Sequence, residues 1–118
     1  MTPTDTIRKV FAVDIHAEGI ETYKAWHRAG GPPAAVTTAI RADDIRELDI
    51  YLVGDRMVLI MEQGPDFDPI AKAARDDNNP DVQAWDALMR TFQKRLPFGP
   101  EGSTWLEMER IYALSEQP

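Results

Sequence analysis

The alternation of apolar and polar positions divides the chain into strands and helices. Val10–Ile15 is mostly apolar and contains β-branched residues, which predicts a first strand. A helical pattern over Ala17–Ala29 follows, and it stops at Gly30-Gly31-Pro32-Pro33 because glycine and proline interrupt helices. A second, shorter helix is expected from Pro33 to Ala42, since proline suits the first turn of a helix.

Two further segments predict a hairpin whose strands are apolar on both faces. Ile45–Val53 and Met57–Glu62 flank a short turn at Gly54-Asp55. Successive side chains of a strand point to opposite faces. In the first strand of the hairpin, Ile50 and Leu52 point one way, and Tyr51 and Val53 point the other. Because the helices of one subunit cover only one face of a sheet, we expect a second copy to cover the other face in a twofold homodimer.

The rest of the chain predicts two more helices and a last strand. A short helix is expected over Ile70–Arg75, and a longer one begins with Asn79 as its N-cap and Pro80 at its first position. The apolar stripe of this longer helix comprises Val82, Trp85, Leu88, Met89, Phe92 and Leu96. Trp105–Leu114 predicts the last strand. This order of elements predicts an α+β fold of ferredoxin-like type, a four-stranded antiparallel sheet with helices on one face.

Composition and charge narrow the range of partners. The 118 residues suffice for one hydrophobic core, so we expect a single domain over residues 1–118. The formal net charge of −7, with scattered Lys and Arg, argues against nucleic acid and membrane surfaces as partners. The absence of cysteine excludes disulfides and thiolate chemistry. No segment resembles a signal peptide and no apolar run approaches the ~18 residues that span a bilayer, so we expect a cytoplasmic protein.

One face of the first predicted helix carries a distinctive set of side chains. At about 100° per residue, Ile20, Tyr23, Trp26 and His27 fall within one arc of roughly 120°. Aromatic rings with polar tips on an inward-facing arc are typical of a small-molecule pocket. An amphipathic helix with a hydrogen-bonded core histidine has the same spacing, so the pattern alone leaves both interpretations open.

Five short motifs, taken in order, carry a family resemblance. They are Arg8-Lys9-x-Phe11, Tyr23-x-x-x-His27, Ile50-Tyr51-Leu52, Gln83-x-Trp85-x-x-x-Met89 and Met108-Glu109-Arg110-Ile111-x-x-Leu114. Together they resemble the L-rhamnose mutarotase family of dimeric α/β barrels, which includes L-fucose mutarotases, from about Ile7 to Leu114. The resemblance implies an isomerase that interconverts the α and β anomers of a 6-deoxy-L-hexose, L-rhamnose or L-fucose, by acid–base ring opening.

The resemblance also implies site residues. In the family, the histidine one turn after the tyrosine is the proton donor and the tyrosine contacts the sugar, roles that fall here to His27 and Tyr23. A sugar-binding pair of adjacent tryptophans corresponds to Trp85 and Asp86, and a further sugar-binding tyrosine corresponds to Leu48. These two departures concern the identity of the sugar more than the reaction. Leu48 would offer an apolar surface to a 6-methyl group, which keeps L-fucose a candidate beside L-rhamnose.

Anomer exchange is chemically undemanding, because water alone performs it slowly. One placed acid and one placed base supply about 10²–10⁴-fold each, so neither a metal nor an organic cofactor is expected. An imidazole, with an ordinary pKa near 6.5, suits this work. Of the two histidines, His16 is expected at the surface and His27 in the site. The partner of His27 stays open among Tyr23, Glu62, Asp86, Glu107 and Glu109.

Two other functions remain possible from the sequence. Dimeric barrels also include cofactor-independent oxygenases and haem-binding proteins, in which His27 would be a base or a haem ligand. Only fold analogy supports that interpretation. A non-catalytic module that binds a metabolite would use the same pocket.

Overall fold

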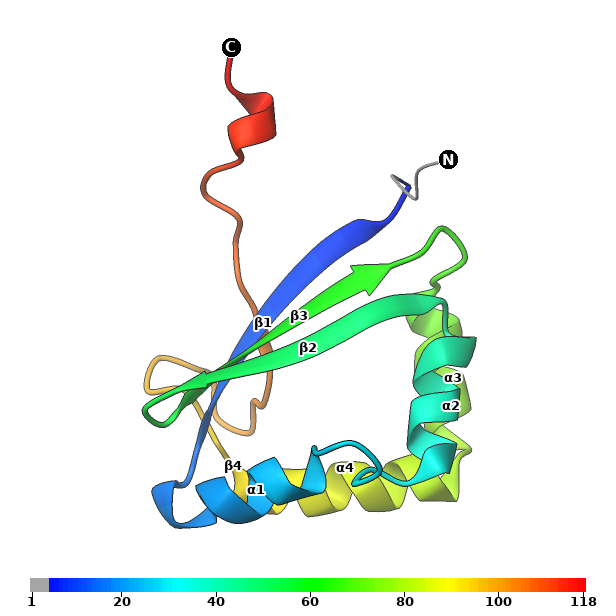
Figure 1. Ribbon diagram of the computed structural model, residues 1–118, viewed down its shortest axis with the longest axis vertical. Coiled ribbons are helices and arrows are strands. Elements are labelled where there is room, and N and C mark those ends of the chain that lie inside the picture. Colours follow the sequence, from blue (N-terminus) through cyan, green and yellow to red (C-terminus); the bar gives the residue numbers. More distant parts are fainter. Residues whose placement is uncertain (1–4) are drawn as a thin grey trace.

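A curled antiparallel sheet lies above two helices that run along one of its faces, and two further helices close one end (Figure 1). This computed structural model describes residues 5–118. The expectation that the N-terminus carries no signal peptide therefore falls mostly outside the described residues. The elements are β1 (Ile7–Ile15), the 3₁₀ turn Ala17–Gly19, α1 (Ile20–Trp26), α2 (Ala34–Ala42), β2 (Ile45–Val53), β3 (Arg56–Gln63), α3 (Pro69–Asp77), α4 (Pro80–Phe92), β4 (Gln93–Lys94), β5 (Leu106–Glu107) and the 3₁₀ turn Leu114–Glu116.

Strand β1 is the centre of the sheet. The strand order is β2-β3-β1-β4, and β5 also pairs with β1. All of these pairings are antiparallel, with Val13 opposite Met57 and Ile50 opposite Leu59. The predicted ferredoxin-like α+β class is therefore confirmed.

The hairpin and the late helix begin where the sequence predicts. Gly54 has φ of +59°, a left-handed conformation that glycine adopts without strain, and it turns β2 into β3. Asn79 caps α4, since its side chain accepts hydrogen bonds from the backbone N–H groups of Asp81 at 3.1 Å and Val82 at 3.3 Å. Local turn and capping chemistry thus determines these boundaries.

The helices expected over Ala17–Ala29 and up to Leu96 are both shorter in the structure. The first opens with a 3₁₀ turn and α1 ends at Trp26. A Cβ atom at Gly31 would collide with the carbonyl oxygen of Trp26, so only glycine allows the chain to fold back so closely there. Helix α4 ends at Phe92 because Gln93 and Lys94 pair with β1.

The prediction of a last strand over Trp105–Leu114 is wrong in its extent. Only Leu106–Glu107 pairs with β1. The chain then leaves the sheet, and the C-terminal segment projects away from the rest of the structure (Figure 1). Within residues 5–118 no strand pairs with residues 108–114.

The core lies between the sheet and helices α1 and α4. Its buried centre comprises Val13, Ile15, Tyr23, Met57 and Met89. The register places Ile50 and Leu59 on this helix-facing side of the sheet, with Tyr51 and Val58 on the outer side. On the outer side Tyr51 is 60% exposed and Val53 is 76% exposed. The sheet is therefore apolar on both faces, as predicted, and its helices cover one of them.

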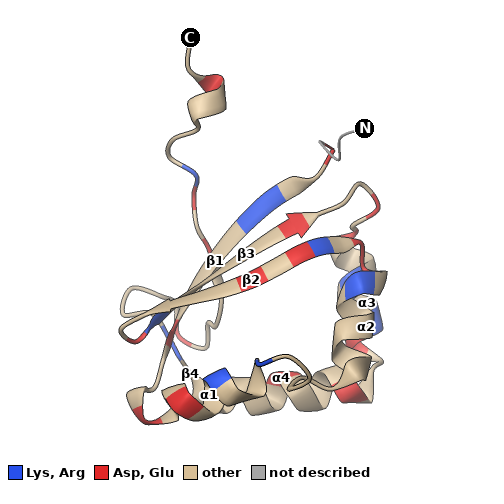
Figure 2. Cartoon of the chain, in the orientation of Figure 1, with Lys and Arg blue, Asp and Glu red and all other residues tan. Residues whose placement is uncertain are grey.

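Ion pairs connect elements around this core. Asp14 of β1 binds Arg56 of β3 through two hydrogen bonds of 2.7 and 3.2 Å. Asp43, which follows α2 and is buried, accepts hydrogen bonds from Lys72 at 3.1 Å and Arg75 at 2.6 Å, both on α3. Lys and Arg are otherwise spread over the elements with no basic stripe along any of them (Figure 2). None of the helices within residues 5–118 has the length and apolar character needed to span a bilayer.

Met57 provides a test of this core. Its side chain is 1% exposed, so Met57→Ala should leave a cavity and lower the free energy of unfolding by about 2–5 kcal/mol. Ile70→Ala is the matched control because Ile70 is 82% exposed, and it should change stability by about 0.5 kcal/mol or less. Urea denaturation of both variants measures the difference. Equal losses would contradict this assignment of the core.

Candidate functional site

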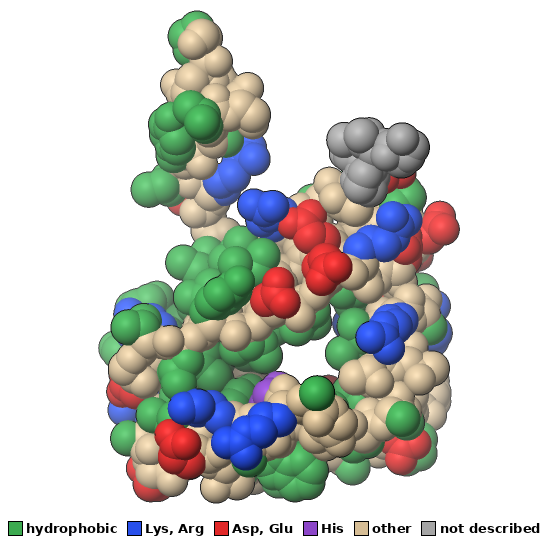
Figure 3. All heavy atoms as spheres, in the orientation of Figure 1, with side chains coloured by type: hydrophobic (Ala, Val, Ile, Leu, Met, Phe, Trp, Pro, Cys, Tyr) green, Lys and Arg blue, Asp and Glu red, His purple; other side chains and the backbone are tan. Residues whose placement is uncertain are grey.

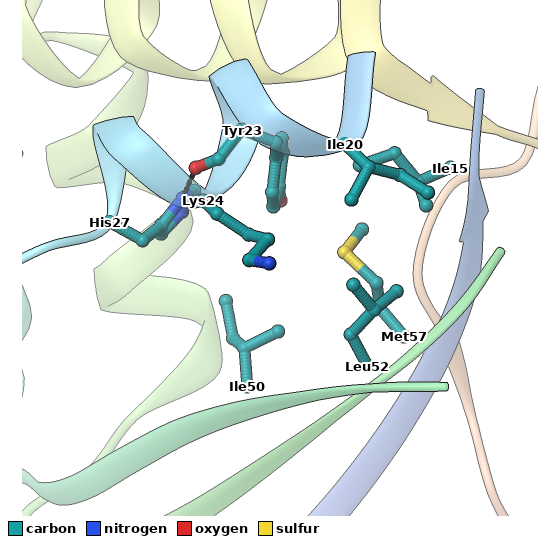
Figure 4. A pocket seen from close by; sticks show the side chains of 8 residues that line it. All are labelled: Ile15, Ile20, Tyr23, Lys24, His27, Ile50, Leu52 and Met57. Atoms are coloured by element: carbon teal, nitrogen blue, oxygen red, sulfur yellow. Dashed lines mark hydrogen bonds between the residues drawn. The ribbon is translucent and has the colours of Figure 1, made fainter. Parts of the chain in front are cut away.

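A cavity of about 150 Å³ lies between α1 and the strands β2 and β3. The side chains that line it are Ile15, Ile20, Tyr23, Lys24, His27, Ile50, Leu52 and Met57. Those of α1 reach in from one side and those of the hairpin from the other (Figure 4). An apolar cavity of this order holds benzene. A hexose is larger, so it would extend through the opening between sheet and helices that the space-filling view shows (Figure 3).

The imidazole of His27 is held by the backbone of its own helix. Its Nδ1 lies 2.7 Å from the carbonyl oxygen of Tyr23, four residues earlier. A carbonyl only accepts hydrogen bonds, so Nδ1 carries the hydrogen and donates it. This assigns the tautomer and leaves Nε2 as the hydrogen-bond acceptor of the neutral imidazole. Within residues 5–118 no partner occupies Nε2.

Aromatic rings enclose the imidazole on two sides. The ring of Tyr23 lies 4.4 Å from that of His27, measured between centroids, with 31° between the planes. The ring of Trp85 approaches from α4 at 5.5 Å, edge to face. Trp26 in turn contacts Trp85 at 5.9 Å. The Tyr23, Trp26 and His27 arc expected from the sequence is thus present, although Trp26 lies at its exposed margin and does not line the cavity.

The phenol of Tyr23 is fixed by a relay of hydrogen bonds that sequence reasoning missed. Thr104 donates to the Oε1 of Gln93 at 2.6 Å, and the Nε2 of Gln93 donates to the Tyr23 hydroxyl at 3.3 Å. Because its oxygen already accepts from Gln93, the hydroxyl hydrogen is free to donate. Burial raises the pKa of Tyr23 above its usual value, and the bond from Gln93 opposes that effect only in part. Gln93 and Thr104 lie 70 and 81 positions away, which is why no local pattern links them to Tyr23.

Lys24 is a second residue that sequence reasoning missed. Its ammonium points into the cavity beside Tyr23 (Figure 4) and lies 3.4 Å from Glu21. It follows Ile20 by four residues and precedes His27 by three, so helical spacing places it next to the same face. The sequence signal that could have identified Lys24 is a long charged side chain at the border of the apolar helix face. Lys24 brings a positive charge to a cavity that is otherwise mostly apolar.

Three predicted substrate contacts lie around this cavity without lining it. Trp85 is half-buried and contacts His27, as described above. Leu48 projects from β2 on the helix-facing side, opposite Met61 and two residues before Ile50. Asp86 is half-buried on α4, and burial raises the pKa of its carboxyl group. The sugar-binding roles of all three residues stay predictions.

Two of the carboxylates considered as partners of His27 are engaged elsewhere. Glu62 accepts hydrogen bonds from Arg8 and Thr6, on the outer side of the sheet, and Arg8 holds the pKa of Glu62 below its usual value. Glu107 pairs with Lys9 at 3.2 Å. Glu109 is exposed on the projecting C-terminal segment. Among the described residues, no group of three or more acidic or histidine side chains is placed to hold a metal ion.

Comparison with known proteins identifies relatives of this chain. The sequence model of the L-rhamnose mutarotase family matches residues 8–114. An L-fucose mutarotase of Xanthomonas campestris pv. campestris is 44% identical over 111 residues, which cover 92% of this chain and 89% of that protein. A UPF0734 protein of Dictyostelium discoideum is 33% identical over 101 residues, which cover 82% and 79% of the two chains.

A solved structure shares the fold. It is the crystal structure of an L-rhamnose mutarotase from Formosa agariphila, with a TM-score of 0.65 and 14% sequence identity, covering 92% of this chain and 98% of that one. At this identity the match concerns the fold alone, and it agrees with the topology described above. Mutarotases are isomerases that act on carbohydrate anomers. By its match to the family's sequence model and its 44% identity to an L-fucose mutarotase, the chain belongs to the L-rhamnose mutarotase family.

Proposed function

We propose that this protein exchanges the α and β anomers of a 6-deoxy-L-hexose, L-rhamnose or L-fucose, with His27 as the proton carrier. The observation that carries this proposal is the position of His27 in the cavity wall, between two aromatic rings and with Nδ1 fixed by the Tyr23 carbonyl. The names of the 44% identical relative and of the matching family support the substrate class.

In this mechanism the ring oxygen O5 gains a proton while the anomeric hydroxyl loses one. The imidazolium of His27 gives its Nε2 proton to O5 as the C1–O5 bond breaks, and a base, a water molecule or a side chain, takes the hydrogen of O1. The product is the open aldehyde. Rotation about the C1–C2 bond presents the other face of the aldehyde, and the same proton transfers in reverse close the ring. No atom is gained or lost, so the reaction needs no co-reactant.

The walls of the cavity and the residues around it supply the contacts that hold the sugar in this proposal. A pyranose has an apolar C–H face and a hydroxylated rim, which suits aromatic rings with polar tips. In the proposal Tyr23 donates a hydrogen bond to the sugar and Trp85 packs against its apolar face. Leu48 and Asp86, the two positions at which this chain departs from the family, also contact the sugar in this proposal. Leu48 lies next to the 6-methyl group.

Family membership favours this reaction over the other two functions open from the sequence. An oxygenase or haem-binding role rested on fold analogy, and a purely binding role rested on the existence of a pocket. Neither draws support from the family match or from the relative's name, whereas anomer exchange draws support from both.

We also propose that two copies associate through the outer face of the sheet. The support is the exposure there of Tyr51 and Val53, because contiguous exposed apolar groups on one face mark interaction sites in soluble proteins. A twofold axis would bring the same residues of both copies together. The cytoplasmic location stays a prediction from the sequence.

The first test removes the proton carrier. His27→Gln should keep the fold and lose most of the acceleration, about 10²–10⁴-fold, because glutamine cannot exchange a proton near neutral pH. Saturation-transfer NMR of the anomeric protons of L-rhamnose and L-fucose measures the rate. His16→Gln is the matched control, since His16 is exposed and lies outside the cavity. A wild-type rate in His27→Gln would exclude His27 from the mechanism.

The second test uses the pH dependence of stability. Because the folded-state pKa of Tyr23 is raised, the unfolded chain loses this proton first as the pH rises through about 10. Below that pH both states are protonated and the contribution is complete, whereas above it unfolding becomes progressively favoured. Urea denaturation between about pH 9 and 11 should therefore show a steeper loss of stability for wild type than for Tyr23→Phe. Parallel curves would argue against a buried, neutral phenol.

The third test concerns sugar choice. Leu48→Tyr should reduce the preference for 6-deoxy sugars over their 6-hydroxy counterparts, measured as the kcat/KM ratio of L-fucose to L-galactose and of L-rhamnose to L-mannose. A change of about tenfold is expected, because one small apolar contact gives discrimination of that order. Tyr51→Phe, on the outer side of the same strand, is the control and should leave both ratios unchanged. Unchanged ratios in Leu48→Tyr would remove Leu48 from the sugar site.

A further inference from the structure

A second cavity, of about 490 Å³, lies at the C-terminal end of α4. Arg90 of α4, Lys94 of β4 and the following residue, Arg95, line one part of it, and the loop at residues 101–104 lines another. Within residues 5–118, no residue lines both this cavity and the one that contains His27. Small-molecule sites span about 300–1,000 Å³, so the second cavity is large enough for a metabolite.

The second cavity gathers positive charge in a protein that is acidic overall. Asp and Glu outnumber Lys and Arg by 20 to 13, and the formal net charge is −7. Most Lys and Arg side chains are in ion pairs with these carboxylates. Within residues 5–118 the exceptions are Arg28, Arg41, Arg90, Lys94 and Arg95. Three of the five unpaired cations therefore line a single cavity.

The fold itself accounts for one of these three cations. Arg90 lies in the last turn of α4, where a positive charge offsets the partial negative charge of the helix end, and it partly opposes the effect of burial on the pKa of Asp86. Lys94 lies opposite Asp14 in the sheet, but that carboxylate is already bound at 2.7 Å by an arginine of β3. Arg95 has no carboxylate partner within the described part of the chain. Lys94 and Arg95 are thus exposed cations that remain available to an anion.

The loop that lines the second cavity carries groups that suit hydroxyls. Glu101 is exposed and is in no ion pair within residues 5–118, so its oxygens can accept hydrogen bonds from a ligand. The Oγ atom of Ser103 is shielded from solvent and has no hydrogen-bond partner among the described residues. A buried polar atom without a partner costs free energy, and rotation about the Cα–Cβ bond can offer this hydroxyl to a ligand. A matching ligand therefore has hydroxyls as well as negative charge.

We propose that the second cavity binds a phosphorylated sugar, with Arg90, Lys94 and Arg95 at the phosphate and Glu101 at a sugar hydroxyl. A phosphate monoester carries a charge of about −1.5 to −2 near pH 7 and three acceptor oxygens. The planar guanidinium of arginine matches phosphate oxygens with two parallel hydrogen bonds. This inference does not depend on the proposed anomer exchange.

The distribution of charge favours one small ligand over a polyanion. Nucleic acids and anionic membranes bind to extended positive surfaces, because each of their many phosphates needs a neighbouring cation. Here Lys and Arg form no continuous stripe along the elements (Figure 2), and the protein as a whole would repel a polyanion. The source of the phosphate is therefore a soluble metabolite.

The second cavity adjoins the hydrogen bonds that hold Tyr23. Gln93 and Thr104, which form the relay to the Tyr23 hydroxyl, also line this cavity. A ligand bound there would lie against the relay, on residues that do not line the cavity of His27. The side-chain amide of Gln93 is therefore a spectroscopic marker of where a ligand binds.

The test measures binding of three sugar phosphates to the full chain by calorimetry: glucose 6-phosphate, glucose 1-phosphate and ribose 5-phosphate. Inorganic phosphate is the reference, and at least one sugar phosphate should bind more tightly than it does. Lys94→Gln and Arg95→Gln should each raise the Kd of that ligand about fivefold, because each removes a charge-assisted hydrogen bond. Arg41→Gln is the matched control, since it removes an unpaired cation outside the second cavity and should leave the Kd unchanged. Equal losses in all three variants would overturn the inference.

Glu101→Ala separates the phosphate contact from the sugar contact. Loss of a like charge beside the phosphate should tighten the binding of inorganic phosphate. The same variant should reduce the preference for the sugar phosphate over inorganic phosphate, because the acceptor for the hydroxyl is lost. Weaker binding of inorganic phosphate together with an unchanged preference would overturn the inference.

Nuclear magnetic resonance locates the bound ligand. The side-chain amide signals of Gln93 and the backbone amide signals of residues 102–104 should shift when the sugar phosphate is added. Lys24→Gln, in the wall of the other cavity, should leave the Kd unchanged. Shifts confined to α1, no sugar phosphate bound more tightly than inorganic phosphate (an adventitious ion only), or stronger binding to phosphatidylserine vesicles or to an RNA oligonucleotide would each overturn the inference. Anomeric exchange enters none of these measurements, so their failure leaves the proposed function untouched.

Discussion

The burial of Tyr23 between the sheet and α4 is the contact on which the rest of the structure depends. Its ring belongs to the same buried cluster as Val13, Ile15 and Met57, so it fixes how α1 lies on the sheet. The carbonyl oxygen of the same residue orients His27, and its hydroxyl accepts from Gln93. One residue therefore couples the packing of the core to the geometry of the site. A change in core packing that shifts α1 moves the proposed proton carrier with it.

The second constraint is that a three-strand sheet with short additions leaves both an edge and a face unpaired. Strand β1 is protected by pairing on both sides, but β2 is not, and the outer face exposes Tyr51 and Val53. Helices cover only the opposite face. In the proposed homodimer, the second copy covers the outer face that the helices leave exposed.

Local chemistry explains which parts of this structure could be predicted from the sequence. The turn at Gly54 and the cap at Asn79 depend on neighbours within a few residues, and both were predictable. Helical spacing likewise placed Tyr23 and His27 on one face. The end of α4 depends on pairing with β1, a contact across 80 positions, and no local signal reports it. The last strand is shorter than the sequence pattern predicts, because within residues 5–118 only its Leu106–Glu107 part pairs with β1, and no local signal reports where that pairing stops.

The composition of the cavity fits a reaction that demands little catalytic power. Anomer exchange proceeds in water, so in the proposed mechanism one oriented imidazole and a second proton acceptor suffice, at about 10²–10⁴-fold each. The hydrogen bond to Nδ1 keeps Nε2 in one place without a buried carboxylate, and the cavity is mostly apolar, with Tyr23, Lys24 and His27 as its polar side chains. Since so few groups are needed for the chemistry, the remaining wall is free to vary. In the proposed mechanism, differences between relatives should therefore concentrate at positions around the cavity such as Leu48 and Asp86, where they alter which sugar fits while proton transfer at His27 is preserved.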